Sequence, residues 1–429
     1  MLNRRDFLSQ LGGGFGLAAL QGTLQAESAR KPHFAPKAKH VIFLFLNGGM
    51  SQVDTFDPKP ALTKYNGQPM PGPKIRTDRA SGELMRSPFE FRPHGQSGLE
   101  VSEIFPRIAN RIDDFCVIRS MYTDNGNHGP SLQIMNCGHQ LPGRPSLGSW
   151  VTYGLGTENE NLPGFIVLCP GFPVLGSSLW TSGYLPTIYQ GVHIQNDSIE
   201  PDKLIRDLHN TDLTIDEQKR QLGLLGQLNR RYVQRVGDQP QLNGAIQSME
   251  SAFRMQTEAS DVFDIRKEPE KVRARYDVSD FGRGCLMALR LVESGVRMVQ
   301  IYYGNFQPWD NHDDIRVHAK LAQKTDGPVA ALIEDLKSRG LLDETLVVIG
   351  SEFGRTPMIQ NSGLEKLGCG RDHNPPAFTV LLAGGGIKGG IAYGATDDFG
   401  FKAIENKVHI HDLHATILNQ LGFDHTRLT

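Results

Sequence analysis

Short runs of apolar residues alternate with long helical patterns in the second half of this sequence. The runs VRMVQIYY (296–303), TLVVIG (345–350) and AFTVLLAGG (377–385) are typical of short strands that are covered on both faces. A helical stretch at 315–342 separates the first two runs, and we predict that it is interrupted at 327–328. Strands that alternate with long helices predict an α/β fold with one large, mainly parallel sheet and helices on both faces.

The same pattern appears near the N-terminus and is absent from a middle segment. HVIFLFL (40–46) is a further buried strand, which ends in a sharp NGG turn. Residues 201–276 are instead rich in Gln, Arg, Leu and Glu at helical spacing, and DEQKRQLGLLGQLNRRYVQRV (216–236) is a clear amphipathic helix. We therefore predict a single domain over residues 31–429 with a helical insertion at about 201–276.

The first 30 residues have the features of an export signal. Arg4 and Arg5 precede an apolar segment at 11–20 that contains several glycines, and LQA at 24–26 offers small residues for cleavage. The order RRDFL resembles a twin-arginine signal, and an amphipathic N-terminal helix is the alternative. We therefore expect residues 1–30 to direct the chain through the twin-arginine export machinery, to the periplasm or the exterior. No apolar run after this segment is long enough to span a membrane.

The charge balance and the cysteines exclude several classes of partner and site. The chain has 45 Lys and Arg residues against 47 Asp and Glu residues, so it lacks the positive excess that nucleic-acid binding requires. No CxxC pair is present, which argues against a zinc ribbon or a thioredoxin-type site. One disulfide is compatible with an oxidising compartment, and the sequence leaves its pair open among Cys116, Cys137, Cys169, Cys285 and Cys369.

Histidines and carboxylates gather where strands are predicted to end. Asp310 and His312 follow one predicted strand, whereas Glu352 and Arg355 follow the next and His373 precedes the third. Ligands of open α/β sheets bind beyond the carboxyl ends of the strands. Imidazole and carboxylate ligands suit zinc, manganese or iron, and calcium where oxygen predominates. We therefore predict a divalent-metal site formed by Asp310, His312 and His373, with Glu352 either a fourth ligand or in contact with a ligand. The alternative for Glu352 and Arg355 is a salt bridge that closes a turn.

Five motifs carry a resemblance to a known family. They are FLFLNGGMSQVDTFDPKP, NHGPS, WDNH, GSEFGRTP and GRDHNPPAFTVLLAGGGIKGG. With them the chain resembles, from about residue 38 to its end, the DUF1501 family of secreted proteins. That family is similar to a branch of the alkaline phosphatase-like superfamily, which also holds sulfatases and cofactor-independent phosphoglycerate mutases. The resemblance implies a large parallel-sheet α/β domain that, in active members, binds two divalent metals.

The resemblance also indicates how many of the two metal sites of active members this chain retains. The four predicted ligands follow the order of the superfamily's ligand positions. Asn47, however, stands where the first-strand metal Asp is usual, and Phe353 stands at a ligand His. A phenyl ring cannot coordinate a metal, and both replacements fall mainly on the same metal position. The resemblance therefore implies one metal site.

Three residues are candidate nucleophiles or acid–base groups, namely Ser51, His128 and Ser131. Ser51 follows two glycines in a turn, and HGPS resembles the sulfatase Cys-x-Pro-Ser-Arg segment. His128 stands at the nucleophile of that segment, so no formylglycine can be made there. Arg355 is the candidate anion clamp, since a planar guanidinium binds phosphate or sulfate through two parallel hydrogen bonds. The alternative for the two serines is helix N-capping.

These features together predict an exported, metal-dependent hydrolase of phosphate or sulfate esters. A bound metal would activate a water or hydroxyl group and polarise the ester oxygen of an anionic small-molecule or polysaccharide substrate. The alternative is a catalytically degenerate member that binds an anionic ligand or a surface partner without turnover. Metal content and assays on sulfate and phosphate esters separate the two.

Overall fold

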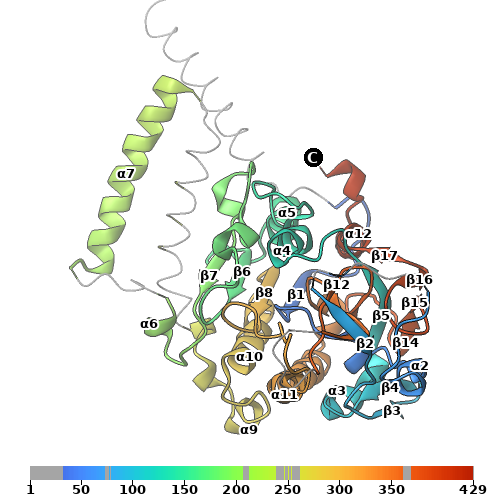
Figure 1. Ribbon diagram of the computed structural model, residues 1–429. Helices are drawn as coiled ribbons and strands as arrows, with labels where there is room; N and C mark the ends of the chain where they lie inside the picture. Colours follow the sequence, from blue (N-terminus) through green and yellow to red (C-terminus); the bar gives the residue numbers. More distant parts are fainter. Residues whose placement is uncertain are drawn as a thin grey trace, which may run out of the picture.

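A nine-stranded sheet forms the centre of the molecule (Figure 1). The computed structural model describes residues 32–72, 77, 79–205, 212–237, 246, 250, 253, 261–360 and 369–428, so the predicted signal at 1–30 lies outside the described residues. In spatial order the strands are β14 (Ile391–Tyr393), β5 (Phe115–Tyr122), β13 (Phe378–Ala383), β9 (Thr345–Gly350), β1 (His40–Phe45), β8 (Met298–Tyr302), β6 (Phe165–Leu168) and β7 (Val192–Ile194). The ninth strand, β17 (Val408–His409), pairs with β5.

Eight of the nine strands run in one direction, which confirms the mainly parallel sheet. β7, β6, β8, β1 and β9 form parallel pairs in this order, and β14 and β17 are parallel to β5. β13 is antiparallel to both of its neighbours. Parallel neighbours need a long crossover, usually a helix. Between β9 and β13 the described residues form only the short strands β10 (Gly354–Arg355), β11 (Met358–Gln360) and β12 (His373–Asn374), so the chain returns antiparallel.

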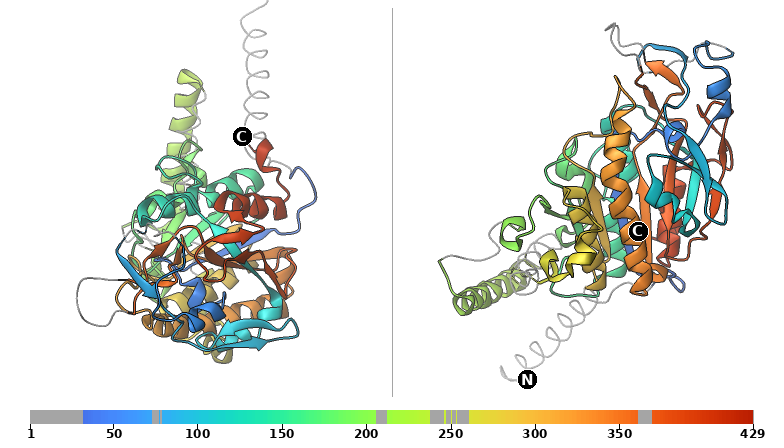
Figure 2. Two further views of the ribbon diagram at one scale, coloured as in Figure 1. Left: turned by 45° about the vertical axis from the view of Figure 1, so that its right-hand side comes forward. Right: turned by 90° about the horizontal axis from the view of Figure 1, so that it is seen from below.

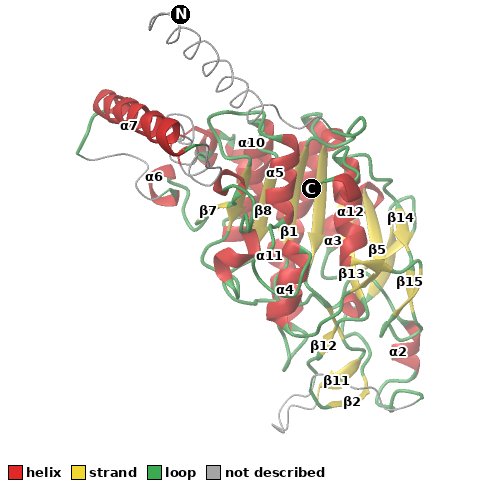
Figure 3. Cartoon of the chain, turned by 90° about the horizontal axis from the view of Figure 1, so that it is seen from above, coloured by secondary structure: helices red, strands yellow, loops and turns green. Residues whose placement is uncertain are grey.

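Helices cover both faces of the sheet (Figures 2 and 3). Along β1, the side chains of Ile42 and Leu44 pack into one core, and those of Val41, Phe43 and Phe45 pack into the other. Strand side chains alternate between faces, so each core belongs to one face. The first core contains α3 (Pro106–Ala109), α10 (Asp280–Glu293) and α11 (Val317–Ser338), and the second contains α4 (His128–Cys137), α5 (Leu147–Leu155) and α12 (Ile410–Gln420). The predicted α/β architecture is therefore confirmed.

Several short elements outside the main sheet lie between its strands in the sequence. They include helix α2 (Pro60–Lys64) and strands β2 (Ser81–Leu84), β3 (Phe91–His94), β4 (Leu99–Ser102), β15 (Ala395–Thr396) and β16 (Ala403–Glu405). Two-stranded sheets are formed by β3 with β4, β15 with β16, β11 with β2, and β10 with β12. The last of these pairs contributes directly to the candidate site.

Helix α11 runs through Pro328 without a break, so the interruption predicted at 327–328 is wrong. A proline inside a helix removes one backbone hydrogen bond and usually kinks or ends the helix. In α11 the residues after the proline, Val329, Leu332 and Ile333, are fully buried in the core. Burial of this apolar face stabilises the helix against the local cost of Pro328.

The described part of the predicted insertion is helical. It contains α6 (Pro201–Leu204), α7 (Ile215–Val236) and α9 (Glu270–Arg273), and its described residues form no strand. α7 begins at a capping box, in which the side chains of Thr214 and Glu217 each bond to the other's backbone N–H. Only Gln218 is buried among the described side chains of α7, and the helix stands away from the sheet in Figures 1 and 2. Among the described residues, no helix is both long and apolar enough to cross a membrane.

The disulfide that the sequence left open is not formed. All five cysteines are free, and Cys116, Cys137, Cys169 and Cys285 are buried. Burial raises the pKa of Cys137 and of Cys169 to about 12, so both stay protonated at neutral pH. These thiols therefore act as small apolar residues of the core.

Candidate metal centre

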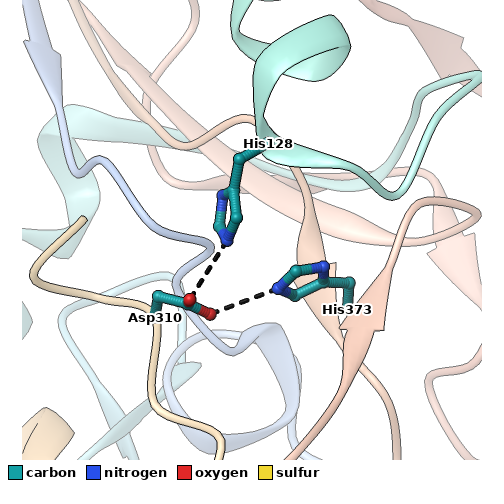
Figure 4. A group of neighbouring side chains, drawn as sticks. All are labelled: His128, Asp310 and His373. Atoms are coloured by element: carbon teal, nitrogen blue, oxygen red, sulfur yellow. Dashed lines mark hydrogen bonds and ion pairs between the residues drawn. The ribbon is translucent and has the colours of Figure 1, made fainter. Parts of the chain in front are cut away.

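Loops that follow neighbouring strands bring the predicted site together. β8 and β9 lie on either side of β1 in the sheet, so their carboxyl ends meet at one edge. The loop after β8 carries Asp310 and His312, and the segment after β9 carries Glu352. His373 lies on β12, and His128 is the first residue of α4. Residues far apart in the sequence thereby converge on one point (Figure 4).

Asp310 is the centre of this cluster. Its Oδ1 lies 2.8 Å from Nε2 of His312 and 3.2 Å from Nε2 of His373. Its Oδ2 lies 3.2 Å from Nε2 of His128, and Nη2 of Arg355 donates to Oδ1 at 2.6 Å. Burial alone would raise the pKa of Asp310, but the three histidines and the charge of Arg355 hold it well below its usual range. The carboxylate is therefore ionised at neutral pH.

Glu352 lies behind His128 and orients it. Oε1 of Glu352 is 2.7 Å from Nδ1 of His128, and the N–H of Gly48 lies 3.0 and 3.1 Å from the two carboxylate oxygens. The Ser351 hydroxyl donates to Oε2 at 2.9 Å. Burial raises the pKa of Glu352, but His128 and Gly48 together hold it below the usual value. An ionised carboxylate only accepts, so Nδ1 of His128 carries a proton and its Nε2 faces Asp310.

His312 and His373 are oriented in the same way. Nδ1 of His373 lies 2.7 Å from the carbonyl oxygen of Gly126, and Nδ1 of His312 bonds to Oε1 of Gln360. Both partners are acceptors, so Nδ1 carries the proton in each ring. All three imidazoles therefore direct Nε2 at the Asp310 carboxylate.

This donor set fits a divalent metal ion. His128, Asp310 and His373 each offer one ligand atom, and these atoms lie within 4.8 Å of one another. Nε2 of His128 and Nε2 of His312 are buried and have no well-aligned hydrogen bond, although both lie close to Asp310. Lone pairs that face a carboxylate repel it, and a cation between them removes the repulsion. A hydrogen bond from Nδ1–H to a carboxylate or a carbonyl is usual for metal-binding histidines.

In the metal-free protein a proton on His128 partly offsets this repulsion. Burial lowers the pKa of His128, but its contacts with Asp310 and Glu352 raise it to about 9. His128 is therefore an imidazolium between two carboxylates at neutral pH. A metal ion that binds Nε2 must displace this proton, so metal binding and proton release are coupled at this site.

Arg355 is fully buried, and its guanidinium group bonds to other groups of this protein. Its Nε donates to the carbonyl oxygen of Gly49 at 2.8 Å, and its Nη1 donates to that of Arg371 at 3.1 Å. Nη2 forms the ion pair with Asp310. The salt bridge offered as the alternative to a site therefore goes to Asp310 and not to Glu352 among the described residues. Arg355 fixes the glycine turn against the Asp310 loop.

The hydroxyl groups of Ser51 and Ser131 make internal hydrogen bonds. Oγ of Ser51 donates to Oδ2 of Asp54 at 2.5 Å, and Oγ of Ser131 donates to the carbonyl oxygen of Asn125 at 2.6 Å. Asp54 also accepts from Arg371 at 2.7 and 3.1 Å, and this pair is fully buried. Neither serine hydroxyl caps a helix, and neither bonds to the cluster among the described residues.

Of the two positions at which the chain departs from the pattern that the resemblance implies, Phe353 lines the site and Asn47 bonds to the loop after β8. The ring centroid of Phe353 lies 4.8 Å from that of His128 and 4.5 Å from that of His373, so the phenyl group fills the space beside both imidazoles. Nδ2 of Asn47 donates to the carbonyl oxygens of Gly304 and Phe306, and its buried Oδ1 has no hydrogen-bond partner. The side of the cluster at Phe353 is therefore apolar.

Comparison with known proteins identifies the family. The model of the family described as "Protein of unknown function (DUF1501)" matches residues 38–429. The chain belongs to the DUF1501 family. No curated protein sequence matches it.

Several solved structures are distantly similar to this DUF1501 protein. The PsFucS1 sulfatase from Pseudoalteromonas sp. is 13% identical with a TM-score of 0.35, and the match covers 94% of this chain and 70% of that chain. A TAB5 alkaline phosphatase mutant with bound Mg is 11% identical with a TM-score of 0.38, covering 91% and 99%. The lipoteichoic acid synthase LtaP from Listeria monocytogenes is 10% identical with a TM-score of 0.40, covering 92% and 74%. A likeness this distant carries no conclusion about function.

The structure of the DUF1501 protein gives His128 a place that the sequence did not predict, and it adds Gly126 and Gln360 to the site. His128 was expected as a nucleophile or an acid–base group, and the structure brings it into the cluster. The NHGPS motif indicates that a helix begins at His128, because Asn is a common N-cap residue. In the structure Asn127 caps α4 by accepting from the N–H of Gly129 at 3.1 Å. No sequence pattern predicted that Gly126 and Gln360 accept hydrogen bonds from the site. Gly126 does so through its backbone carbonyl, which every residue has.

Proposed function

We propose that this DUF1501 protein is an exported, metal-dependent hydrolase of phosphate or sulfate esters. The observation that carries the proposal is the convergence of three imidazole Nε2 atoms on the ionised carboxylate of Asp310. Buried polar groups are normally satisfied by hydrogen bonds, so unpaired imidazole nitrogens around a carboxylate are unusual in a core that has only a structural role. Perturbed titratable groups at the carboxyl edge of a parallel sheet are typical of functional sites.

Each residue of the cluster has a defined task in this proposal. His128, Asp310 and His373 hold the metal, and His312 lies beside them as a further nitrogen ligand. The nitrogen-rich set favours zinc, manganese or iron over calcium, which prefers oxygen. When bound, a metal supplies Lewis-acid chemistry: it polarises an ester oxygen and lowers the pKa of a water molecule. Arg355 keeps Asp310 in position.

Glu352 orients the ligand His128 and does not itself bind the metal in this proposal. It holds the proton on Nδ1 of His128 and so keeps Nε2 available. Phe353, packed against two of the imidazoles, excludes water from one side of the cluster. A drier site strengthens the electrostatic attraction between the ligands and a cation.

Binding of an anionic ligand without turnover is the second candidate. It is favoured by the internal hydrogen bonds of Ser51 and Ser131, which leave both candidate nucleophiles engaged within the protein. Hydrolysis in which water is the nucleophile needs no side-chain nucleophile, so these bonds are compatible with hydrolysis. Turnover assays separate the two candidates.

The first test is metal content. Protein reconstituted with zinc, manganese, iron or calcium should carry one metal ion per chain by elemental analysis. His373→Ala should lose most of it, whereas His139→Ala, at an exposed histidine, should retain it. Absence of metal from the reconstituted wild type would overturn the proposal. A panel of sulfate and phosphate monoesters and diesters then distinguishes an enzyme from a binding protein.

A further inference from the structure

Three exposed apolar side chains lie on two loops beside the metal cluster. Phe172 and Leu175 belong to the loop after β6, and Phe306 belongs to the loop after β8. Their exposed fractions are 48%, 44% and 67%, respectively. We refer to these three residues as the apolar rim.

Both loops that carry the apolar rim lie near residues of the metal cluster. A Cβ atom at Gly129 would lie 3.9 Å from Cδ1 of Leu175, and Gly129 directly follows the ligand His128. Phe306 lies on the loop that leads to Asp310. Leu175 therefore lies close to the residue that follows His128, and the loop that carries Phe306 continues to Asp310.

Hydrogen bonds fix the two loops to each other. The N–H of Phe306 donates to the carbonyl oxygen of Phe172 at 2.9 Å, and the side-chain oxygen of Asn305 accepts from the N–H of Phe172 at 3.0 Å. Pro173 and Phe306 also form an isolated parallel bridge. The apolar rim is therefore held in place by the backbone.

Two of the three residues of the apolar rim have a strained backbone, and burial of their side chains does not compensate for it. Leu175 has a φ of 73° and Phe306 a φ of 54°, in the region that favours glycine. The other non-glycine residues with positive φ in the described part of the chain are Asp277 and Asn406, whose residue types are among those enriched there. Leu and Phe lack this tolerance, and exposed side chains gain little from the core. Strain of this kind collects at ligand sites, where the side chain contacts something outside the chain.

We propose that the apolar rim is a subsite for the organic part of the ester, and that the alcohol of the substrate carries a ring with a flat apolar face. This inference rests on the proposed function, because the metal centre fixes the anionic group beside the rim. Two phenyl groups and a leucine remove an apolar ring face from water, which is favourable roughly in proportion to its area. A short alkyl alcohol offers no such area. An aryl group and the C–H face of a pyranose both have this chemistry.

The test compares ligands that differ only in the ring. Calorimetry on the metal-loaded protein measures the Kd of phenylphosphonate against methylphosphonate, and of phenylsulfonate against methanesulfonate. Burial of one ring face gives an expected preference of about tenfold for the phenyl ligand of the pair that binds. A hexosyl phosphonate is the third arm: tighter binding than phenylphosphonate assigns a carbohydrate, and weaker binding assigns an aryl ester.

Variants of the apolar rim supply the controls. Phe306→Gly and Leu175→Gly remove the side chains, and glycine accepts the positive φ of both positions. We expect the phenyl preference to fall toward unity in both variants, with metal affinity unchanged. Tyr393→Ala is the matched control, because Tyr393 is 45% exposed and lies on β14, well removed from β8 in the strand order of the sheet. It should keep the full preference.

The outcomes separate this inference from the proposed function. Equal affinities of the wild type for phenyl and methyl ligands, or an unchanged preference in both glycine variants, would overturn the subsite and leave the metal-dependent function standing. A metal-loaded protein that binds none of the phosphonates or sulfonates contradicts the proposed function, and the subsite fails with it.

Discussion

Replacement of Glu352 with Gln should weaken metal binding although no ligand is removed. Glutamine has the shape of glutamate, but it offers one acceptor oxygen and one donor NH₂ group. If the NH₂ group faces His128, it donates to Nδ1, which moves the ring proton to Nε2 and removes the lone pair that binds metal. If it faces the other way, it meets the N–H of Gly48 and the hydroxyl of Ser351, which are donors to the native carboxylate. Either orientation leaves a conflict.

The magnitude follows from the position of Glu352 behind His128. Loss of a hydrogen-bond partner of a metal-binding histidine costs about 10–100-fold in metal affinity, or about 1.4–2.7 kcal/mol. His128→Ala, which removes the ligand itself, should cost more than this. The free energy of unfolding of the metal-free protein should also fall by about 1–3 kcal/mol, because a buried donor is left without an acceptor.

A competition titration measures the effect directly. Zinc is partitioned between the protein and a chromophoric chelator, for wild type, Glu352→Gln, His128→Ala and the control Glu344→Gln. Glu344 forms an ion pair with Lys39 in which both side chains are about half exposed, so its replacement should leave zinc affinity unchanged. A Kd of Glu352→Gln within about twofold of wild type would refute the orienting role.

Three further predictions address stability and export. Asp54→Asn should lower the free energy of unfolding by about 3–5 kcal/mol in urea titrations, because it leaves the buried charge of Arg371 unpaired. Burial raises the pKa of Asp54, but Arg371 and the hydroxyl of Ser51 together with the rest of its surroundings lower it below the usual value. This stabilisation is therefore complete above the unfolded pKa of about 3.8 and is lost as the pH falls through the lower folded value. A loss under about 1 kcal/mol would contradict the pairing. Burial lowers the pKa of His414 to about 4, so the unfolded state takes up its proton first and stability falls below pH 6.5. His414→Gln should therefore lose about 2 kcal/mol less than wild type between pH 7 and pH 5, and equal losses in denaturation would show that His414 does not titrate in this way. Replacement of Arg4 and Arg5 with Lys should keep the protein inside the cell in fractionation experiments, and normal export of this variant would rule out a twin-arginine signal.

Local pattern was sufficient to predict the strands at the centre of the fold. The runs at 40–46, 296–303, 345–350 and 377–385 became β1, β8, β9 and β13, because continuous apolar runs of this length are stable only between two layers. The direction of β13 was not predictable in the same way. It depends on whether a helix crosses between two strands, which is a property of the connection and not of the strand.

The site was predicted in part for a similar reason. Asp310, His312 and His373 could be grouped because the ends of neighbouring parallel strands meet at one edge of a sheet. The ligand role of His128 depends on how α4 docks on the sheet, and its motif alone suggested a nucleophile. The backbone acceptor of His373, the carbonyl of Gly126, is chemically the same as every other carbonyl in the chain. Its role emerges only from tertiary contacts.

The central position of β1 in the sheet sets a condition on the synthesis of the chain. Its partners in register begin at Met298 and Thr345, roughly 250 to 300 residues downstream of His40 and Val41. A ribosome adds about 5–20 residues per second, so both edges of this apolar strand stay unpaired for tens of seconds. Unpaired apolar edges are templates for aggregation. This apolar strand therefore stays exposed to aggregation until most of the chain has been made, and only a nearly complete chain can close the sheet around β1.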